Sequence, residues 1–198
     1  MIVKYRLYGD WGDGTYNQID RTHAHLNMPA TLLFAEDYAQ QSATLRFELP
    51  DARWRVATQL QLQTDGSYTA PDLQYLMDSP VELSAYSHRS WKVADQYSEA
   101  TIHLALHHQG TEQQLDTFAE KAKAVVAEQQ KIFGEYPKFD YGQYLFIADY
   151  LPYVDGDGME HRNSTILTDE RSLKEANYAQ IETLSHEFFH AWNVERLR

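Results

Sequence analysis

Hydrophobic side chains recur at every second position in short segments of the first hundred residues. In the segment 43–49, Leu45 and Phe47 alternate with Thr44, Arg46 and Glu48. A period of two residues predicts a β-strand with one buried face. The other expected strands, 16–26, 31–35, 54–63 and 100–107, are β-prone runs between turn residues. Together these segments predict a half-buried antiparallel sheet.

The hydrophobic period changes to that of a helix after Gly110. Thr111 and Gln114 have the spacing of a capping box, and apolar residues then recur every three or four positions until Gly134 supplies a C-terminal stop. This pattern predicts a long helix that ends at Gly134. The change of period is also the candidate domain boundary, with a β-rich domain over 1–109 and a second domain over 110–198.

Three further elements are expected after this helix. Residues 144–147 read as a buried strand, and residues 153–158 (YVDGDG) as a glycine-rich loop. A last helix is expected to begin near Asp169 or Ser172, to falter around Asn177 and to continue to Leu197. The predicted fold class is therefore α+β.

Composition and charge exclude several classes of function. The 198 residues are 43% hydrophobic and carry a net charge of -12, which repels the phosphates of nucleic acids and anionic lipid headgroups. No apolar run approaches the ~18 residues of a membrane helix, and the first residues lack the apolar segment of a signal peptide. We therefore expect neither nucleic acid nor a membrane as a partner, while the cellular compartment stays open. Because the chain has no cysteine, His, Asp and Glu are its only strong metal ligands.

His186, Glu187 and His190 form an HExxH motif in the last expected helix. Two histidines at i and i+4 lie about 40° apart on a helix and can share one metal ion, usually zinc. Glu187 can then hold and deprotonate a water molecule without binding the metal. The alternative is a solvated pair of histidines beside an ordinary surface glutamate. The apolar stripe of this helix lies on the opposite side and comprises Ile181, Leu184, Phe188 and Ala191.

The third metal ligand defines the subclass of a zinc peptidase. The metzincin pattern fails, because Asn193 and Arg196 stand where its Gly and His are required. Glu195 projects about 140° away from His190 while the helix continues. We therefore expect the third ligand beyond Arg198.

Three segments together resemble a known family. They are DRTHAHLNMPATLLF at 20–34, GMEHRNST at 158–165 and HEFFHAWNVERLR at 186–198. In these segments the chain resembles the glycyl aminopeptidase family of gluzincin zinc metallopeptidases, which commonly carry a C-terminal PDZ domain and are related to the aminopeptidase N group. The resemblance extends from about Asp20 to Arg198 and is most specific in the last forty residues.

The resemblance implies roles for individual residues. His186 and His190 would bind zinc, and Glu187 would be the catalytic base. Gly158, Met159 and Glu160 match a segment of the aminopeptidase N group that forms an edge strand along the substrate. Its glutamate, here Glu160, receives the free amine of the peptide. The next residue, His161, departs from the asparagine of that pattern.

The resemblance also implies a β-rich N-terminal domain followed by a thermolysin-like catalytic domain. Compared with the family, the chain begins partway through the first domain, contains the catalytic domain only as far as the HExxH helix and has no PDZ domain. We therefore expect a partial zinc aminopeptidase that is inactive as this chain. The competing hypothesis is a non-catalytic, β-rich binding or structural module with a vestigial HExxH helix.

Other histidines and acidic residues give weaker signals. A calcium loop starting at Asp155 fails, because Ile166 stands at its twelfth position. His23 and His25 share one face of a strand, and without a third partner packing or a surface position is favoured over metal binding. His107 and its neighbour His108 point to opposite faces, which disfavours shared ligation by that pair.

Overall fold

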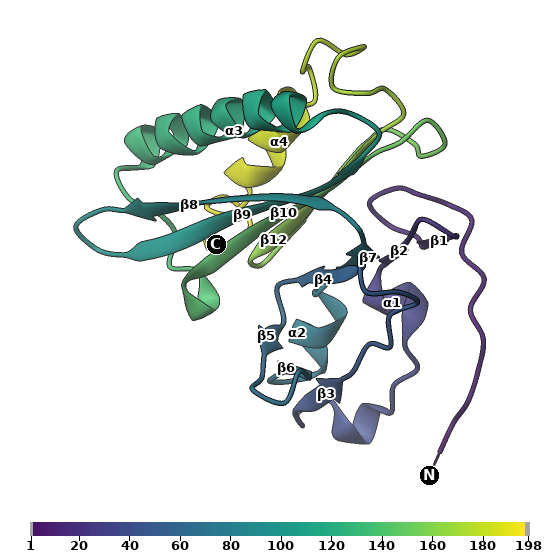
Figure 1. Cartoon of the computed structure of the whole chain (residues 1–198). Helices are drawn as coiled ribbons and strands as arrows, with labels where there is room; N and C mark the ends of the chain where they lie inside the picture. Colours follow the sequence, from purple (N-terminus) through teal and green to yellow (C-terminus); the bar gives the residue numbers. More distant parts are fainter. Residues whose placement is uncertain (1, 197–198) are drawn as a thin grey trace.

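The computed structural model describes residues 2–196, in which two small antiparallel sheets precede a larger mixed sheet (Figure 1). The four-stranded sheet has the order β1 (Gln18–Ile19), β2 (His23–Leu26), β7 (Val81–Ser84) and β4 (Arg55–Thr58). The three-stranded sheet has the order β3 (Ala43–Leu45), β6 (Tyr68–Ala70) and β5 (Gln61–Leu62). Short helices join these strands, namely α1 (Met28–Thr31), η1 (Glu36–Tyr38) and α2 (Leu73–Met77).

The five-stranded sheet carries the second half of the chain. Its order is β11 (Asp157–His161), β12 (Ser164–Asp169), β10 (Gln143–Tyr150), β9 (Glu99–His108) and β8 (Ser87–Ala94). β10 runs parallel to both of its neighbours, whereas the two outer pairs are antiparallel. The predicted boundary at 109/110 falls between β9 and the next helix, so strands from both sides of it share this sheet.

The helix predicted after Gly110 is confirmed as α3 (Glu112–Phe133). The Thr111 hydroxyl accepts a hydrogen bond from the Gln114 amide, and the Gln114 side chain accepts one from the Thr111 amide. Gly134 ends the helix with a φ of 81°, a left-handed conformation that glycine adopts without steric cost. Figure 1 shows α3 along one face of the five-stranded sheet and the N-terminal sheets on the other side.

The alternation of side chains along β9 and β10 builds two cores. Leu104, Leu106 and Phe146 belong to the large core beneath α3. Ala105, Leu145 and Ile147, at the intervening positions, face the N-terminal part and form a smaller cluster with Ala57 of β4 and Tyr86. Since side chains alternate between faces, His107 and Asp149 also point toward the N-terminal part.

The strands expected in the first hundred residues differ from those of the structure. The expected strand 43–49 ends at Leu45, and the expected strands 16–26 and 54–63 each divide into two. The strand expected over 31–35 is wrong, because Pro29 lies in the first turn of α1, Thr31 ends that helix and residues 32–35 form no strand. β7 escaped prediction although Val81 and Leu83 alternate with Glu82 and Ser84, because a run of four residues is too short to stand out in the sequence. β8 also escaped prediction, because its first four residues are polar or charged and only Trp91 and Val93 supply an apolar alternation.

The last helix is shorter than predicted. α4 spans Ile181–Phe189, residues 173–180 form turns, and His190 begins another series of turns. Asn177 and Tyr178 both have positive φ values, which explains the expected interruption at Asn177. Leu197, the predicted end, lies outside the described residues.

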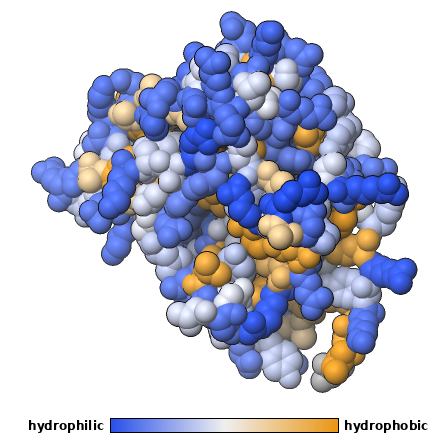
Figure 2. All heavy atoms as spheres, viewed as in Figure 1, coloured by the Kyte–Doolittle hydropathy of each residue, from blue (hydrophilic) through white to orange (hydrophobic). Residues whose placement is uncertain are grey.

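The surface is mainly hydrophilic around α3 and the large sheet, whereas apolar residues gather on the N-terminal part (Figure 2). Exposed apolar side chains of this part include Ile2, Leu33 and Phe34. Within residues 2–196, no helix has both the length and the apolar character that crossing a bilayer demands.

Candidate active site

α4 brings the two histidines of the HExxH motif together. The Nε2 atoms of His186 and His190 lie 3.3 Å apart. Two ligands of a tetrahedral zinc ion, each bound at about 2.0–2.1 Å, are separated by about 3.3–3.4 Å. The observed separation therefore fits two imidazoles that share one zinc ion.

The environment of the histidines favours metal binding by these two nitrogens. The Nδ1 atom of His190 lies 3.1 Å from the backbone oxygen of Asn193. A carbonyl can only accept, so Nδ1 carries the proton in this hydrogen bond and Nε2 keeps its lone pair. The predicted orientation is also confirmed: the His186 side chain is 70% exposed, whereas Leu184 and Phe188 are fully buried beneath it.

Glu187 is buried against the edge strand β11. A Cβ atom added to Gly158 would lie only 2.5 Å from Oε1 of Glu187, so the glycine makes room for this carboxylate. Burial raises the pKa of Glu187, and the negative charges of Glu160 and Asp157 add to this effect. His186 and His190 oppose it. The carboxylate lies 3.9 Å from Nε2 of His186.

Glu160 joins the same group from β11. Glu160, Glu187 and His190 each offer one ligand atom, and these atoms lie within 4.8 Å of one another. Antiparallel pairing with β12 positions the strand, with Gly158 opposite Leu167 and Met159 opposite Ile166. β11 is the edge of its sheet, so in the described part of the chain its outer side has no neighbouring strand.

His161 connects this edge strand to the N-terminal part. Its Nδ1 atom lies 2.9 Å from Oδ1 of Asp78, and the Arg162 amide donates to Oδ2 of the same carboxylate at 3.0 Å. Asp78 caps the C-terminal end of α2. No sequence pattern near Asp78 indicated this contact, because its partners are more than eighty residues away.

Residues after His190 fasten the C-terminal end of α4. The Trp192 ring stacks on Phe133 of α3 with a centroid separation of 4.6 Å, and its indole nitrogen donates to the Glu135 carbonyl. The Arg196 guanidinium donates to the carbonyls of Ala191 and Lys138. These contacts give Trp192 and Arg196 supporting roles that the motif alone did not indicate.

A cleft of about 1030 Å³ lies beside this group of residues. Arg162, just after β11, and Glu195, just after the HExxH motif, both line it. Residues of α2 and of the segment around Tyr141 form other parts of its wall. The cleft therefore lies between the N-terminal part of the chain and the segments that follow β11 and the HExxH motif, and none of His186, Glu187 and His190 lines it.

Two solved structures of similar fold come from proteins named as aminopeptidases or as members of the aminopeptidase N family. An aminopeptidase N family protein from Idiomarina loihiensis superposes with a TM-score of 0.66 and 21% sequence identity over 92% of this chain. Legionella pneumophila aminopeptidase A, in complex with aspartic acid, gives a TM-score of 0.58 and 11% identity, also over 92% of this chain. This chain spans 32% and 23% of the lengths of those two proteins. It therefore has the fold of one part of these larger proteins.

The N-terminal segment matches a more specific family. The model of the Peptidase M61 N-terminal domain matches residues 1–85. The match ends between β7 and β8, where the chain leaves the four-stranded sheet and enters the five-stranded sheet. Among curated protein sequences, no match to the chain was found.

Proposed function

We propose that this chain carries part of the active site of a zinc-dependent aminopeptidase of the gluzincin class, which removes N-terminal residues from peptides. The observation that carries the proposal is the convergence of four side chains. His186 and His190 turn their Nε2 atoms toward each other, while Glu160 and Glu187 reach the same place from β11 and α4. The peptidase family match over 1–85 and the aminopeptidase fold support the same class.

His186 and His190 would hold the zinc ion. When bound, zinc activates a water molecule for attack and polarises the carbonyl of the scissile bond. Glu187 accepts the proton of the attacking water and returns it to the leaving amine. Burial suits Glu187 to this exchange, because it brings the pKa of the carboxyl closer to neutral pH.

Glu160 and β11 would position the substrate. An ionised carboxylate binds the N-terminal ammonium of a peptide through a charge-assisted hydrogen bond, which selects substrates with a free amine. The free side of β11 pairs with an extended peptide, with Gly158 and Met159 forming this edge. Catalytic zinc sites use three protein ligands and a water. The 140° separation that excluded Glu195 assumed a continuing helix, whereas α4 ends at Phe189, but Glu195 joins no group of candidate ligands in the described residues. We therefore propose that the third ligand lies outside residues 1–198, so this chain alone holds zinc weakly at this site and is inactive.

The test is Glu187→Gln in the complete protein. Removal of the base should lower kcat by at least about 100-fold, while zinc bound by the histidine pair stays unchanged. Glu182→Gln changes an exposed glutamate on the same helix and serves as the matched control. Near-normal turnover of Glu187→Gln would refute the assigned role. A complete protein without turnover and without zinc at the histidine pair would favour the non-catalytic module.

A further inference from the structure

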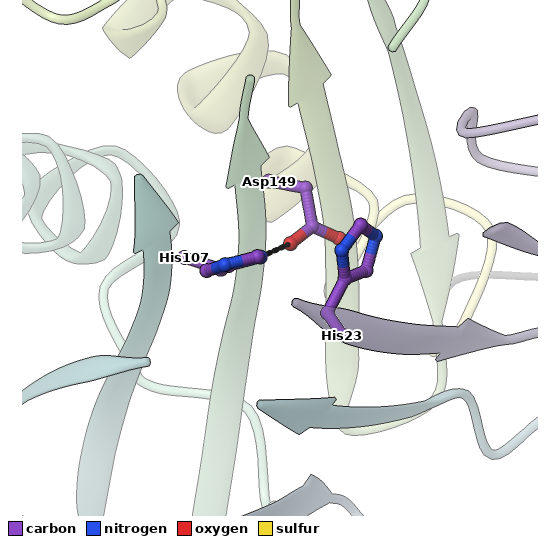
Figure 3. Close-up of side chains that lie close together, drawn as sticks. All are labelled: His23, His107 and Asp149. Carbon is purple, nitrogen blue, oxygen red and sulfur yellow. Dashed lines mark ion pairs between the residues drawn. The ribbon is translucent and has the colours of Figure 1, made fainter. Parts of the chain in front are cut away.

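A second group of titratable side chains lies between the N-terminal part and the five-stranded sheet. It consists of His23 and His25 on β2, Glu82 on β7, His107 on β9 and Asp149 on β10. All except His107 are at most 1% exposed. Figure 3 shows the Asp149 carboxylate between His107 and His23. The sequence favours packing or a surface position for His23 and His25, but the fold gives them partners from distant strands.

Three members have the separations of metal ligands. Nδ1 of His25 lies 2.9 Å from Oδ2 of Asp149 and 3.8 Å from Oε2 of Glu82. One ligand atom of each of the three residues lies within 4.8 Å of the ligand atoms of the other two. Neighbouring ligands of tetrahedral zinc are about 3.3 Å apart, a value between the two observed separations.

The polar atoms of this group contact one another without regular hydrogen bonds. Within residues 2–196, both oxygens of Glu82, both oxygens of Asp149 and both ring nitrogens of His25 are buried and form no hydrogen bond of regular geometry, although Nδ1 of His25 lies 2.9 Å from Oδ2 of Asp149. In this part of the chain the two carboxylates form ion pairs only with His25 and His107, and none with Lys or Arg. Two buried carboxylates require positive charge, which protonation of these histidines or a bound cation supplies. A divalent cation supplies two charges at one point and coordinates the unsatisfied atoms.

His107 completes the surroundings of the carboxylates. Its Nδ1 atom lies 3.4 Å from Oδ1 of Asp149 and 3.9 Å from Oε1 of Glu82. These are the carboxylate oxygens that do not approach His25. His23 meets the edge of the His107 ring at a centroid distance of 4.8 Å. His107 therefore contacts both carboxylates, as outer partners do in metal sites, and His23 packs against His107.

We propose that His25, Glu82 and Asp149 bind one divalent transition-metal ion at this position. Imidazole and carboxylate donors suit zinc and its neighbours in the first transition series rather than calcium or magnesium. The ion would link β2 and β7 to β10 and so hold the N-terminal part against the large sheet. This site is separate from the HExxH motif, and it does not depend on the proposed peptidase function.

The test uses the 198-residue chain with His186→Ala and His190→Ala, which removes the other histidine pair. After dialysis against zinc, this double variant should retain one equivalent of metal and unfold at a higher temperature than its chelator-treated form. Adding His25→Gln or Asp149→Asn should weaken zinc binding at least about 100-fold, the upper end of the loss caused by removing outer partners. His88→Gln, a half-buried histidine on β8, is the matched control and should keep the metal.

Cobalt gives a measurement that does not depend on the folding of the ligand variants. Cobalt bound to the double variant should give the visible spectrum and the X-ray absorption spectrum of an ion with imidazole and carboxylate ligands. Both spectra should differ from those of the hydrated cobalt ion. The proposal fails if the double variant binds no zinc, or if His25→Gln binds zinc as tightly as its parent. It also fails if zinc leaves the NMR signals of the His25 ring unchanged, because a protonated imidazole would then supply the positive charge.

Discussion

The carboxylate of Glu187 rests directly on the backbone of Gly158. Any side chain at position 158 would begin within 2.8 Å of three atoms of Glu187, at the point where α4 passes the edge strand β11. The glycine therefore serves two purposes in the proposed site. It lets β11 approach the HExxH helix, and it keeps the space that the proposed catalytic base occupies.

Gly158→Ala should displace the Glu187 side chain. Forcing a methyl group into this contact should lower the free energy of unfolding by about 1–3 kcal/mol. In the complete protein it should also reduce kcat, because the base no longer holds its position. Gly156→Ala is the matched control, since its Cβ would meet nothing closer than Oε2 of Glu170 at 3.5 Å. Chemical denaturation of both variants checks the first effect, and equal stabilities would contradict it.

Glu160→Ala should remove selectivity for a free N-terminus. Loss of the carboxylate eliminates the proposed charge-assisted bond to the substrate ammonium, so kcat/KM of the complete protein should fall by at least about 10-fold for free peptides. Zinc content should not change, since both histidines remain. The measurement compares free and N-acetylated peptides with the same side chains. Equal losses for the two substrates would mean that Glu160 does not recognise the amine.

The sequence predicted the elements with strong local signals. The capping box at Thr111 and the glycine at 134 located α3, because both act within one helical turn. The orientation of His186 away from the apolar stripe followed from helical geometry alone, and the structure confirms it. Four-residue β7 and mostly polar β8 gave only weak local patterns, and the position of β7 depends on its pairing with the distant strand β2.

The long-range contacts of the site could not be predicted for the same reason. Asp78 reaches His161 across 83 positions of sequence, and His25 meets Asp149 through two strands of different sheets. The spacing of residues along the chain does not predict contacts between residues that are far apart in the sequence. The resemblance to glycyl aminopeptidases nevertheless pointed to Glu160. In the structure, a carboxylate oxygen of Glu160 lies within 4.8 Å of a carboxylate oxygen of Glu187 and of a ring nitrogen of His190.

Asp78→Ala should loosen the end of the edge strand. Asp78 lies 2.9 Å from the His161 ring and accepts from the Arg162 amide at 3.0 Å. Because its side chain is 34% exposed, solvent weakens both contacts, and together they contribute about 1–3 kcal/mol. We expect a loss of about 1–3 kcal/mol in the free energy of unfolding, and faster hydrogen exchange of the Arg162 amide. Asp37→Ala removes an exposed carboxylate of η1 and is the control. Unchanged exchange at Arg162 would show that Asp78 does not hold the strand.

A last prediction concerns the histidine pair formed by His88 on β8 and His103 on β9. Nε2 of His88 lies 3.1 Å from Nδ1 of His103, and the two rings stack. Burial lowers the pKa of both imidazoles, and for His88 the neighbouring His103 adds to the effect. Below about pH 6.5 the unfolded chain therefore binds protons that the folded chain does not, and stability falls as the pH decreases.

His103→Gln should make this loss of stability smaller. The variant removes one of the two imidazoles, so its free energy of unfolding should decline less between pH 7.5 and pH 5.5 than that of the unchanged chain. Because both rings are partly exposed to solvent, the expected difference is on the order of a few tenths of a kcal/mol. Denaturant titrations at several pH values measure it, with His186→Gln as a control for loss of an exposed histidine. If the unchanged chain and His103→Gln lose stability in parallel, then the pair does not resist protonation in the folded state.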